Sequence, residues 1–283
     1  MRSIHSFAVI LLPFLVFLFS GSLSVSAGVL DEVRSKGELM VSTDASYAPQ
    51  SFLDENGELI GFDVDVAREV AERLGVKVRF ITPSWTVVVR GRWGAGWDVS
   101  IGSMTITEER KELLDFSIPY CYGPAQFAVH RDNQTIKTLA DFSGKTVGAG
   151  IATTYETYLN PNMRLVLSGG ERIVYQVEDV SAETYSTDMG AIQDLALGDG
   201  LRLDGVLTSQ YVIFAAMKRG IPIRPVGAPV YYEPMAAASD KARPGSAEFM
   251  KTISEILESM HGDGSLTSFS IKWHGADITR KSR

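Results

Sequence analysis

The chain has 283 residues, 45% of them hydrophobic, and its 27 Lys and Arg against 34 Asp and Glu give a formal charge of −7. This acidic balance argues against nucleic acid and anionic membrane surfaces as partners, and the single cysteine, Cys121, excludes an intramolecular disulfide. Length and composition are those of a globular protein of one or two domains.

The first 27 residues have the pattern of a secretory signal peptide. Arg2 is the only charged residue before Asp31, Phe7–Phe19 is an almost unbroken apolar run, and Val25 and Ala27 fit the small-residue positions of a cleavage site. The alternative is an uncleaved membrane anchor, but the run is shorter than the roughly 20 residues that a spanning helix needs. We therefore expect a periplasmic protein that begins at residue 28.

The next part of the chain alternates between strand and helix patterns. A strand is predicted over Leu39–Ser42, an amphipathic helix over Ala67–Leu74 and a strand over Val76–Phe80, with a turn at Asp54–Gly57. Trp97–Ile101 alternates between apolar and polar residues and predicts a further strand.

A second set of elements follows. It comprises a short helix near Leu139, the strand Thr146–Ala149, a helix from Thr154, the strand Ile173–Val177, the helix Asp188–Leu197 and the strand Leu203–Leu207. This alternation predicts the α/β class with parallel sheets.

No Pro- or Ser-rich linker separates the two sets, so short extended segments are expected to cross between two lobes. Phe127–His130 and Pro229–Ala238 are the candidate crossings. The helix Ser246–His261 and the segment Ser265–Gly275 would then return to pack on the first lobe. Two crossings form a hinge, and a hinge creates a cleft.

The segment Ser103–Arg110 carries the strongest chemical signal. It leaves a predicted strand and enters a predicted helical turn, with Thr107 as N-cap. Arg110 would fold back beside exposed N–H groups and hydroxyls. A charged, planar guanidinium beside such donors can bind a carboxylate through two hydrogen bonds. The alternative is an Arg on a solvated helix face.

Two other corners should face the same cleft, because α/β folds bind ligands at the ends of their strands. In Thr43–Pro49, Tyr47 offers a ring face and Asp44 a partner for a cation. An Asx turn with Tyr47 in the core is an equally weighted alternative. Trp85 on its loop offers a second ring face, or packs as an ordinary buried residue.

A fourth corner, Gly148–Glu156, leads from a strand into a helix N-terminus. Its free N–H groups and the hydroxyls of Thr153 and Thr154 form an anion site. No Lys follows, as a phosphate-binding loop would require. Two carboxylate-binding corners on facing lobes would reinforce each other.

Four motifs occur in order along the chain from Gly28 to its end. They are Gly-Phe-Asp-Val-Asp-Val-Ala at Gly61–Ala67, the Ser103–Arg110 motif, Leu-Asp-Phe-Ser-Ile-Pro-Tyr at Leu114–Tyr120, and Lys-Trp-His-Gly at Lys272–Gly275. Together they resemble the polar amino-acid-binding family of ABC-importer periplasmic proteins, solute-binding protein family 3. The resemblance implies the type II periplasmic binding protein fold, with two α/β lobes joined by two strands. Lobe 1 would be residues 28–128 and 234–283, and lobe 2 residues 129–233.

The resemblance also implies which residues hold the ligand's α-carboxylate. Arg110 and Thr105 would bind it together with the backbone at Gly102 and Ser103, and Thr154 would clamp it from lobe 2.

Further roles follow for the rest of the ligand. Tyr47 and Trp85 would sandwich its side chain. Asp44 matches a position that faces the cationic end in relatives that bind basic amino acids. Asp63 is expected to be structural.

One departure from the family pattern concerns the ligand's α-ammonium. Family members grip this group with an Asp just after a strand of lobe 2, and Ser209 falls on that position. A buried ammonium needs a charged partner. Either Glu233 or Asp188 supplies it, or the ligand is not an ordinary α-amino acid, or the alignment is shifted by one or two residues.

The predicted function is that of the periplasmic solute-binding component of an ABC transporter. Its solute would be an amino acid or a close derivative, and a basic amino acid if Asp44 faces a cation. The expected partners are that solute and an inner-membrane permease, with the protein as a monomer and without cofactor or metal. The alternative is a secreted enzyme like cyclohexadienyl dehydratase on the same fold. It would need a positioned acid or base, for which Glu156 is the one candidate, and Glu156 is better explained as a first-turn helix residue. A third alternative is a secreted sensory module.

Overall fold

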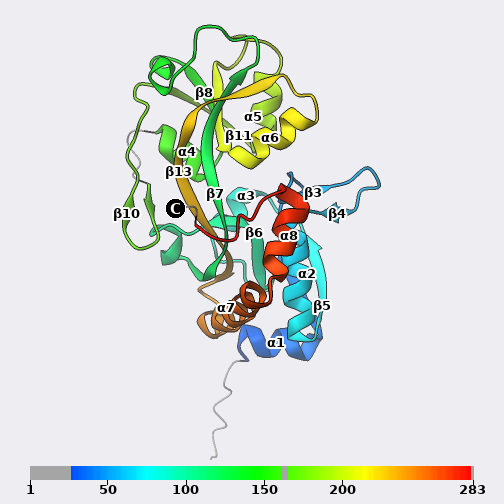
Figure 1. The fold of residues 1–283 in the computed structure, drawn as a ribbon. Coiled ribbons are helices and arrows are strands. Elements are labelled where there is room, and N and C mark those ends of the chain that lie inside the picture. The colour runs from blue at the N-terminus through cyan, green and yellow to red at the C-terminus, as the bar shows by residue number, and fades with distance from the viewer. Residues whose placement is uncertain (1–26, 161–164, 282–283) are drawn as a thin grey trace, which may run out of the picture.

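The computed structural model describes residues 27–160 and 165–281 (Figure 1). The helices are α1 (Val29–Lys36), α2 (Phe62–Leu74), α3 (Trp85–Val89), α4 (Thr154–Leu159), α5 (Asp188–Leu195), α6 (Gln210–Lys218), α7 (Ser246–Asp263) and α8 (Ser265–His274), with 3-10 helices η1 (Arg110–Glu112) and η2 (Leu139–Phe142). The strands are β1 (Glu38–Ser42), β2 (Ser46–Tyr47), β3 (Ser51–Leu53), β4 (Leu59–Ile60), β5 (Lys77–Ile81), β6 (Val99–Thr105), β7 (Leu114–His130), β8 (Thr146–Gly150), β9 (Val166–Leu167), β10 (Glu171–Arg172), β11 (Ser181–Tyr185), β12 (Gly205–Ser209) and β13 (Ile223–Asp240).

Two long antiparallel strands, β7 and β13, connect the two lobes (Figure 1). They lie at the centre of an eight-stranded sheet of order β11-β8-β12-β7-β13-β6-β1-β5. On one side β6, β1 and β5 are mutually parallel, and on the other β12, β8 and β11 are mutually parallel. The crossings predicted within 127–130 and 229–238 lie on these two strands, so the two-lobed α/β architecture is confirmed.

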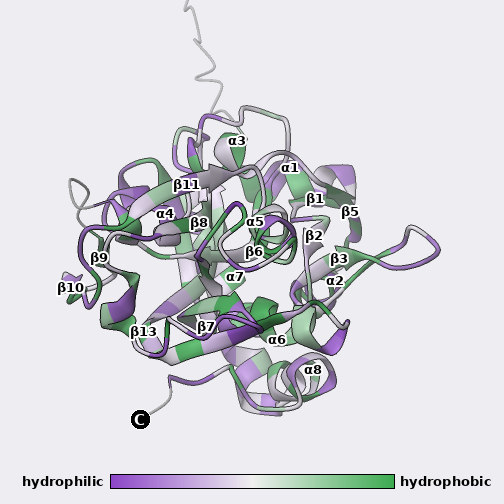
Figure 2. Cartoon of the chain, turned by 90° about the horizontal axis from the view of Figure 1, so that it is seen from above, coloured by the Kyte–Doolittle hydropathy of each residue, from purple (hydrophilic) through white to green (hydrophobic). Residues whose placement is uncertain are grey.

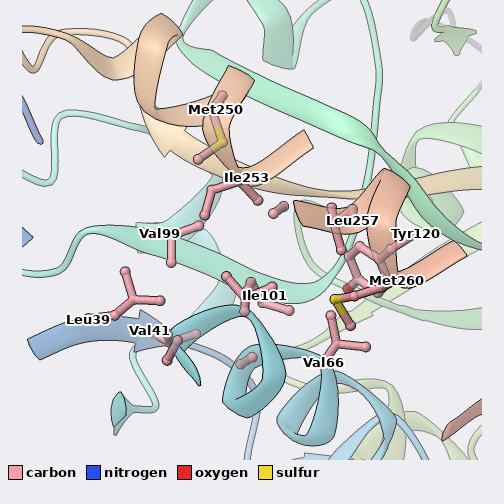
Figure 3. Packing of buried hydrophobic residues seen from close by; sticks show 14 of the residues in the cluster. Leu39, Val41, Val66, Val99, Ile101, Tyr120, Met250, Ile253, Leu257 and Met260 are labelled. Carbon is pink, nitrogen blue, oxygen red and sulfur yellow. The ribbon is translucent and has the colours of Figure 1, made fainter. Parts of the chain in front are cut away.

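The first lobe has its core between β1, β6 and the helices that cover them (Figure 3). Val66 on α2 and Leu257 on α7 pack there against Val99 and Ile101 of β6. The helical periodicity of α2 creates this buried face, and Gly75, with φ of +74°, ends the helix as its left-handed C-cap. The return of α7 and α8 to this lobe agrees with the sequence prediction.

The second lobe has cores of its own. One cluster includes Phe127 and Phe142, whose ring centroids are 4.6 Å apart, and another includes Ile192, Val206 and Ile213. Each lobe thus buries its own apolar residues, and the residues that line the space between the lobes are mostly polar or aromatic.

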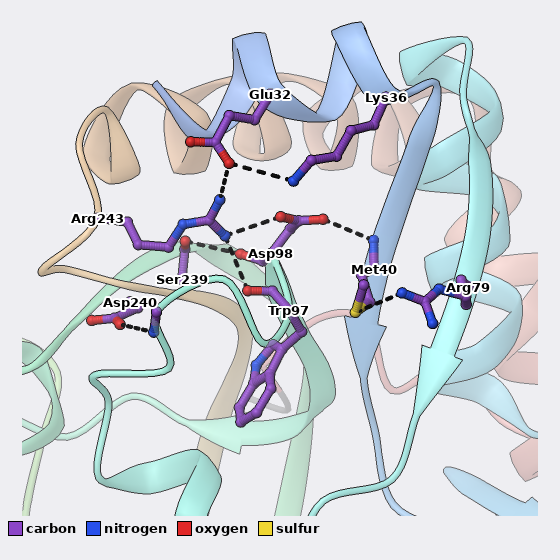
Figure 4. A network of polar contacts seen from close by, with 10 residues as sticks. Glu32, Lys36, Met40, Arg79, Trp97, Asp98, Ser239, Asp240 and Arg243 are labelled. Carbon is purple, nitrogen blue, oxygen red and sulfur yellow. Dashed lines mark hydrogen bonds and ion pairs between the residues drawn. The ribbon is translucent and has the colours of Figure 1, made fainter. Parts of the chain in front are cut away.

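A buried ion-pair network holds the first lobe together around Arg243 (Figure 4). Its guanidinium donates to Asp98 Oδ1 at 3.0 Å, to Glu32 Oε2 at 2.8 Å and to the carbonyl of Trp97 at 3.0 Å. Asp98 in turn accepts the N–H of Met40 on β1. The network joins the chain after β13 to α1, β1 and the start of β6.

The turn predicted at Asp54–Gly57 forms the tip of a small hairpin. Asp54 Oδ1 accepts the N–H groups of Asn56 and Glu58 between β3 and β4. Figure 2 shows this hairpin projecting from the body of the molecule with a hydrophilic tip.

Two predicted elements differ in the structure. Ile173–Val177 is not a strand: its alternating apolar residues pack on the second-lobe core, but the N–H of Gln176 donates to the Tyr158 hydroxyl and not to a neighbouring strand. The strand at the edge of the sheet, beside β8, is instead β11, Ser181–Tyr185. The helical turn after Thr107 is the short 3-10 helix η1, in which the Thr107 hydroxyl accepts the Arg110 N–H at 3.1 Å.

The predicted signal peptide, apart from Ala27, lies outside the described residues. Within residues 27–160 and 165–281, none of the helices combines the length and the apolar character that crossing a membrane would require.

Candidate ligand-binding site

A cleft between the lobes encloses about 740 Å³ of space, part of it open to solvent. Ten of the eleven residues predicted as ligand contacts line it, and Ser209 does not. The ten are Asp44, Tyr47, Trp85, Gly102, Ser103, Thr105, Arg110, Thr153, Thr154 and Glu233. The four predicted corners thus meet in one place, because the ends of β1, β6 and β8 and the start of α3 all face the gap between the lobes.

Arg110 is a buried cation that has no ion pair within 4.0 Å among the described residues. Its Nη1 donates to the carbonyl of Thr105 at 3.0 Å, and Nη2 donates to the carbonyl of Ala152 at 3.1 Å. The guanidinium lies 5.3 Å from the centre of the Trp85 ring. Burial lowers the pKa of Arg110, and the charge of Glu233 opposes this.

Glu233, on β13, is held by hydroxyls from both lobes. Its Oε1 accepts the hydroxyl of Thr105 at 2.7 Å and the hydroxyl of Thr154, and its Oε2 accepts that of Tyr155 at 2.8 Å. Burial raises the pKa of Glu233, and these hydrogen bonds oppose the rise. The two threonine hydroxyls that the resemblance assigns to a ligand carboxylate therefore donate here to a carboxylate of the protein.

Asp44 forms the Asx turn that one of its sequence interpretations predicted, and it lies in the cleft as the other requires. Its Oδ1 accepts the N–H and the hydroxyl of Ser46, which is an Asx turn, and the residue also lines the cleft. Tyr47 packs against the core of the second lobe, and its hydroxyl lies 3.2 Å from that of Tyr155.

The predicted backbone site at Gly102 and Ser103 is partly occupied. The Ser103 N–H donates to the Tyr120 hydroxyl at 2.8 Å, and the Ser103 hydroxyl donates to Asp63. Ser103 has a φ of +52°, and this network holds it in that unusual conformation. Asp63 thus supports the cleft wall from behind, as its predicted structural role implies.

Thr153 is the N-cap of α4. Its hydroxyl accepts the Glu156 N–H at 3.2 Å and donates to the carbonyl of Gly150 at 2.6 Å. The Glu156 carboxylate accepts the N–H of Ala152, whose φ is +59°. Glu156 therefore positions the turn that places the Ala152 carbonyl against Arg110 and against Trp85 Nε1, 3.1 Å away.

Two titratable groups of the cleft, Asp188 and Tyr155, are absent from the predicted contact set. Asp188 has a buried carboxyl whose Oδ1 accepts the Gly150 N–H at 3.1 Å, and burial raises its pKa to about 7. The sequence identified Asp188 as an alternative acid, but Tyr155 carried no signal, because a Tyr on an amphipathic helix is usually core. Ser209 is fully buried and accepts the N–H of Tyr211 as the N-cap of α6.

Among the described residues, no His side chain lines the cleft, and no cluster of three His, Cys, Asp or Glu side chains is suited to a metal ion.

Comparison with known proteins places this cleft in a family. The model of the bacterial extracellular solute-binding proteins, family 3, matches residues 39–276. The L-cystine-binding protein TcyJ of Escherichia coli (strain K12) is 32% identical over 254 residues, which cover 89% of this chain and 88% of that protein.

Two solved structures show the same fold. An ancestral arginine-binding protein bound to arginine is 34% identical with a TM-score of 0.72, covering 84% of this chain and 99% of that one. The ancestral amino acid-binding protein AncCDT-1, a precursor of cyclohexadienyl dehydratase, is 30% identical with a TM-score of 0.74, covering 86% and 98%. These matches confirm the predicted family and the two-lobed type II fold. The chain belongs to the bacterial extracellular solute-binding proteins, family 3.

Proposed function

We propose that the protein captures an amino acid with a cationic side chain between its lobes in the periplasm and, as a monomer, delivers it to the inner-membrane permease of an ABC importer. The observation that carries this proposal is the buried guanidinium of Arg110, which faces the cleft and has no carboxylate within 4.0 Å among the described residues. A buried charge without a partner is unfavourable, so the site suits a ligand that brings a carboxylate.

Arg243 provides the contrast within the same lobe. It is equally buried, but two carboxylates, Asp98 and Glu32, neutralise it. A structural arginine in this protein is thus paired by the protein itself. Arg110 uses two of its N–H groups on backbone carbonyls and keeps others for an anion.

The charge balance of the cleft supports a cationic side chain. Among the described residues, three acids, Asp44, Asp188 and Glu233, line it together with one cation, Arg110. A ligand with two positive groups and one carboxylate compensates this excess better than a neutral amino acid does. The rings of Tyr47 and Trp85 would flank the ligand's side chain.

The relatives support a binding protein for amino acids: one is named for L-cystine, and another was solved with arginine. We further propose residues 28–128 with 234–283 as lobe 1 and 129–233 as lobe 2. Binding without catalysis is the proposed activity, because Glu156, the candidate base from the sequence, is engaged in the Ala152 turn. The cleft acids Asp188 and Glu233 also accept hydrogen bonds from the protein itself.

The test is calorimetry with L-arginine, L-lysine, L-glutamine and L-cystine, using the full mature chain. We expect Arg110→Ala to weaken binding of the best ligand on the order of 100-fold, because a buried charge pair is lost. Arg68→Ala, which removes a half-exposed arginine from α2, is the matched control and should bind normally.

Near-native affinity of the Arg110→Ala protein would contradict the carboxylate site. Equal affinity for L-lysine and L-glutamine would remove the cationic class, and a preference for L-cystine would point to a ligand with two ammonium groups. Turnover of prephenate would favour the dehydratase alternative.

A further inference from the structure

An α-amino acid in the cleft presents an ammonium group as well as a carboxylate, and the source of its anionic partner is open. Ser209, at the family's acidic position, does not line the cleft and carries no charge. The acids that do line the cleft are Asp44, Asp188 and Glu233. Their hydrogen bonds differ, and these differences separate their roles.

Glu233 already has most of its acceptor capacity filled. Both of its oxygens accept hydroxyls, from Thr105, Thr154 and Tyr155. Because these donors come from both lobes and Glu233 lies on β13, its carboxylate links the two lobes through hydrogen bonds. Removing it would loosen the cleft as a whole rather than one ligand contact.

Asp188 lines the cleft where β8 ends, one strand away from the end of β12 that carries Ser209. It begins α5, which follows β11 after two loop residues, and its carboxylate lies across the end of β8, where Oδ1 accepts the Gly150 N–H. In the sheet β8 lies between β11 and β12. On its far side the Thr208 side chain of β12 lies near this carboxyl without a hydrogen-bond partner of its own among the described residues, and the Tyr47 hydroxyl lies near both Asp188 and Ser209.

Gly150 makes this crossing possible. A Cβ at that position would lie 2.8 Å from Asp188 Oδ1 and 3.0 Å from a methyl carbon of Thr153. Any side chain there would push the carboxylate away from the end of β8. The position of the Asp188 carboxylate therefore depends on a glycine at position 150.

We propose that Asp188, lying across Gly150, receives the α-ammonium of the ligand and so replaces the acid that the family pattern places at position 209. This assignment rests on the proposed function, since it presupposes an α-amino acid. It gives the cleft two fixed ends: Arg110 for the carboxylate, and Asp188 for the ammonium. Asp44, whose Oδ1 is engaged by Ser46, is left to face the side chain.

The test compares L-arginine with 5-guanidinopentanoate, which is arginine without its α-amino group, by calorimetry. We expect Asp188→Asn to weaken the affinity for L-arginine on the order of 100-fold. The affinity for 5-guanidinopentanoate should change by less than about threefold. Asp194→Asn removes a carboxylate from the same helix outside the cleft and serves as the control for charge and helix stability. Glu233→Gln should lower the affinity for both compounds by the same factor.

Gly150→Ala provides a second variant that leaves Asp188 in place. Like Asp188→Asn, it should lower the affinity for L-arginine more than the affinity for 5-guanidinopentanoate, because the new Cβ displaces the Asp188 carboxylate. Gly262→Ala is its control: a Cβ there would meet no atom within 4 Å.

Equal losses for the two compounds in Asp188→Asn, or an ammonium-selective loss in Glu233→Gln, would overturn the assignment while leaving the proposed function intact. Failure of the unmodified protein to bind either L-arginine or L-lysine would instead overturn the proposed function, and the assignment with it.

Discussion

Burial sets the ionisation of Asp63, the carboxyl behind the cleft wall. It is fully buried and accepts hydrogen bonds from the Tyr120 hydroxyl, at 2.8 Å, and the Ser103 hydroxyl. Desolvation raises its pKa to about 7, and the two hydroxyls oppose the rise. At neutral pH the support of the Ser103 corner therefore depends on a carboxyl that is close to its titration point.

This shift predicts a pH dependence of stability. Between about pH 4 and pH 7 the folded protein keeps the Asp63 proton, while the unfolded chain loses it. The free energy of unfolding therefore falls as pH rises through this range, by at most about 1.4 kcal/mol per pH unit. His274, whose pKa burial lowers to about 4, contributes in the opposite direction as pH falls below its ordinary value.

We expect Asp63→Asn, an uncharged isostere, to remove the Asp63 contribution, so that its stability relative to the unmodified protein improves as pH rises from 5 to 7. Urea denaturation at several pH values measures this difference. A pH-independent difference between the two proteins would show that Asp63 does not titrate in this range.

At the scale of elements, the Arg110 corner is paired with the segment that contains β9. The Glu108 N–H donates to the Val166 carbonyl at 3.1 Å, and the Ser168 N–H donates to the Ile106 carbonyl at 3.1 Å. Thr107 and Leu167 form the antiparallel bridge between them. A short two-stranded contact thus joins the chain just before Arg110 to a segment of the opposite lobe.

This contact should stabilise the closed cleft. Ser168→Pro removes one donor of the pair and should weaken ligand binding about fivefold, as expected for one hydrogen bond of about 1 kcal/mol. Ser168→Ala keeps the N–H and is the control. Calorimetry gives the affinity and small-angle scattering the degree of closure; identical results for the two variants would mean that the contact does not contribute.

At the scale of the molecule, the chain passes through both lobes and returns to the first. Its last segment, after β13, packs α7 and α8 on the first-lobe core. Arg243, at the point of return, pairs with Glu32 on α1 and with Asp98 just before β6. This network ties the end of the chain to its beginning, away from the cleft.

Removing that tie should affect stability and not binding. We expect Arg243→Met to lower the free energy of unfolding by about 3 to 5 kcal/mol, because Asp98 is left buried without its cation. Ligand affinity at a temperature where the variant is folded should be unchanged. Lys251→Met, at an exposed position of α7, is the control for lost charge. A large loss of affinity in Arg243→Met would contradict this separation of roles.

The local patterns were sufficient for most elements, because helical periodicity, glycine caps and strand alternation act over neighbouring residues. The same reasoning was wrong for Ile173–Val177, since alternation indicates which side chains are buried but not whether a strand lies alongside. It also did not assign the hydroxyls of Thr105 and Thr154 to Glu233, which is far from both in sequence.

By itself, the sequence determined the family, the two-lobed fold and the four corners that meet in the cleft, because each corner is a local strand end with its own motif. Only the tertiary structure decided how the acids are used. Glu233 meets hydroxyls from two lobes, and Asp188 accepts the Gly150 N–H at the end of β8, one strand away from β12. These contacts depend on the order of strands in the sheet and on the closure of the lobes, which no local pattern contains.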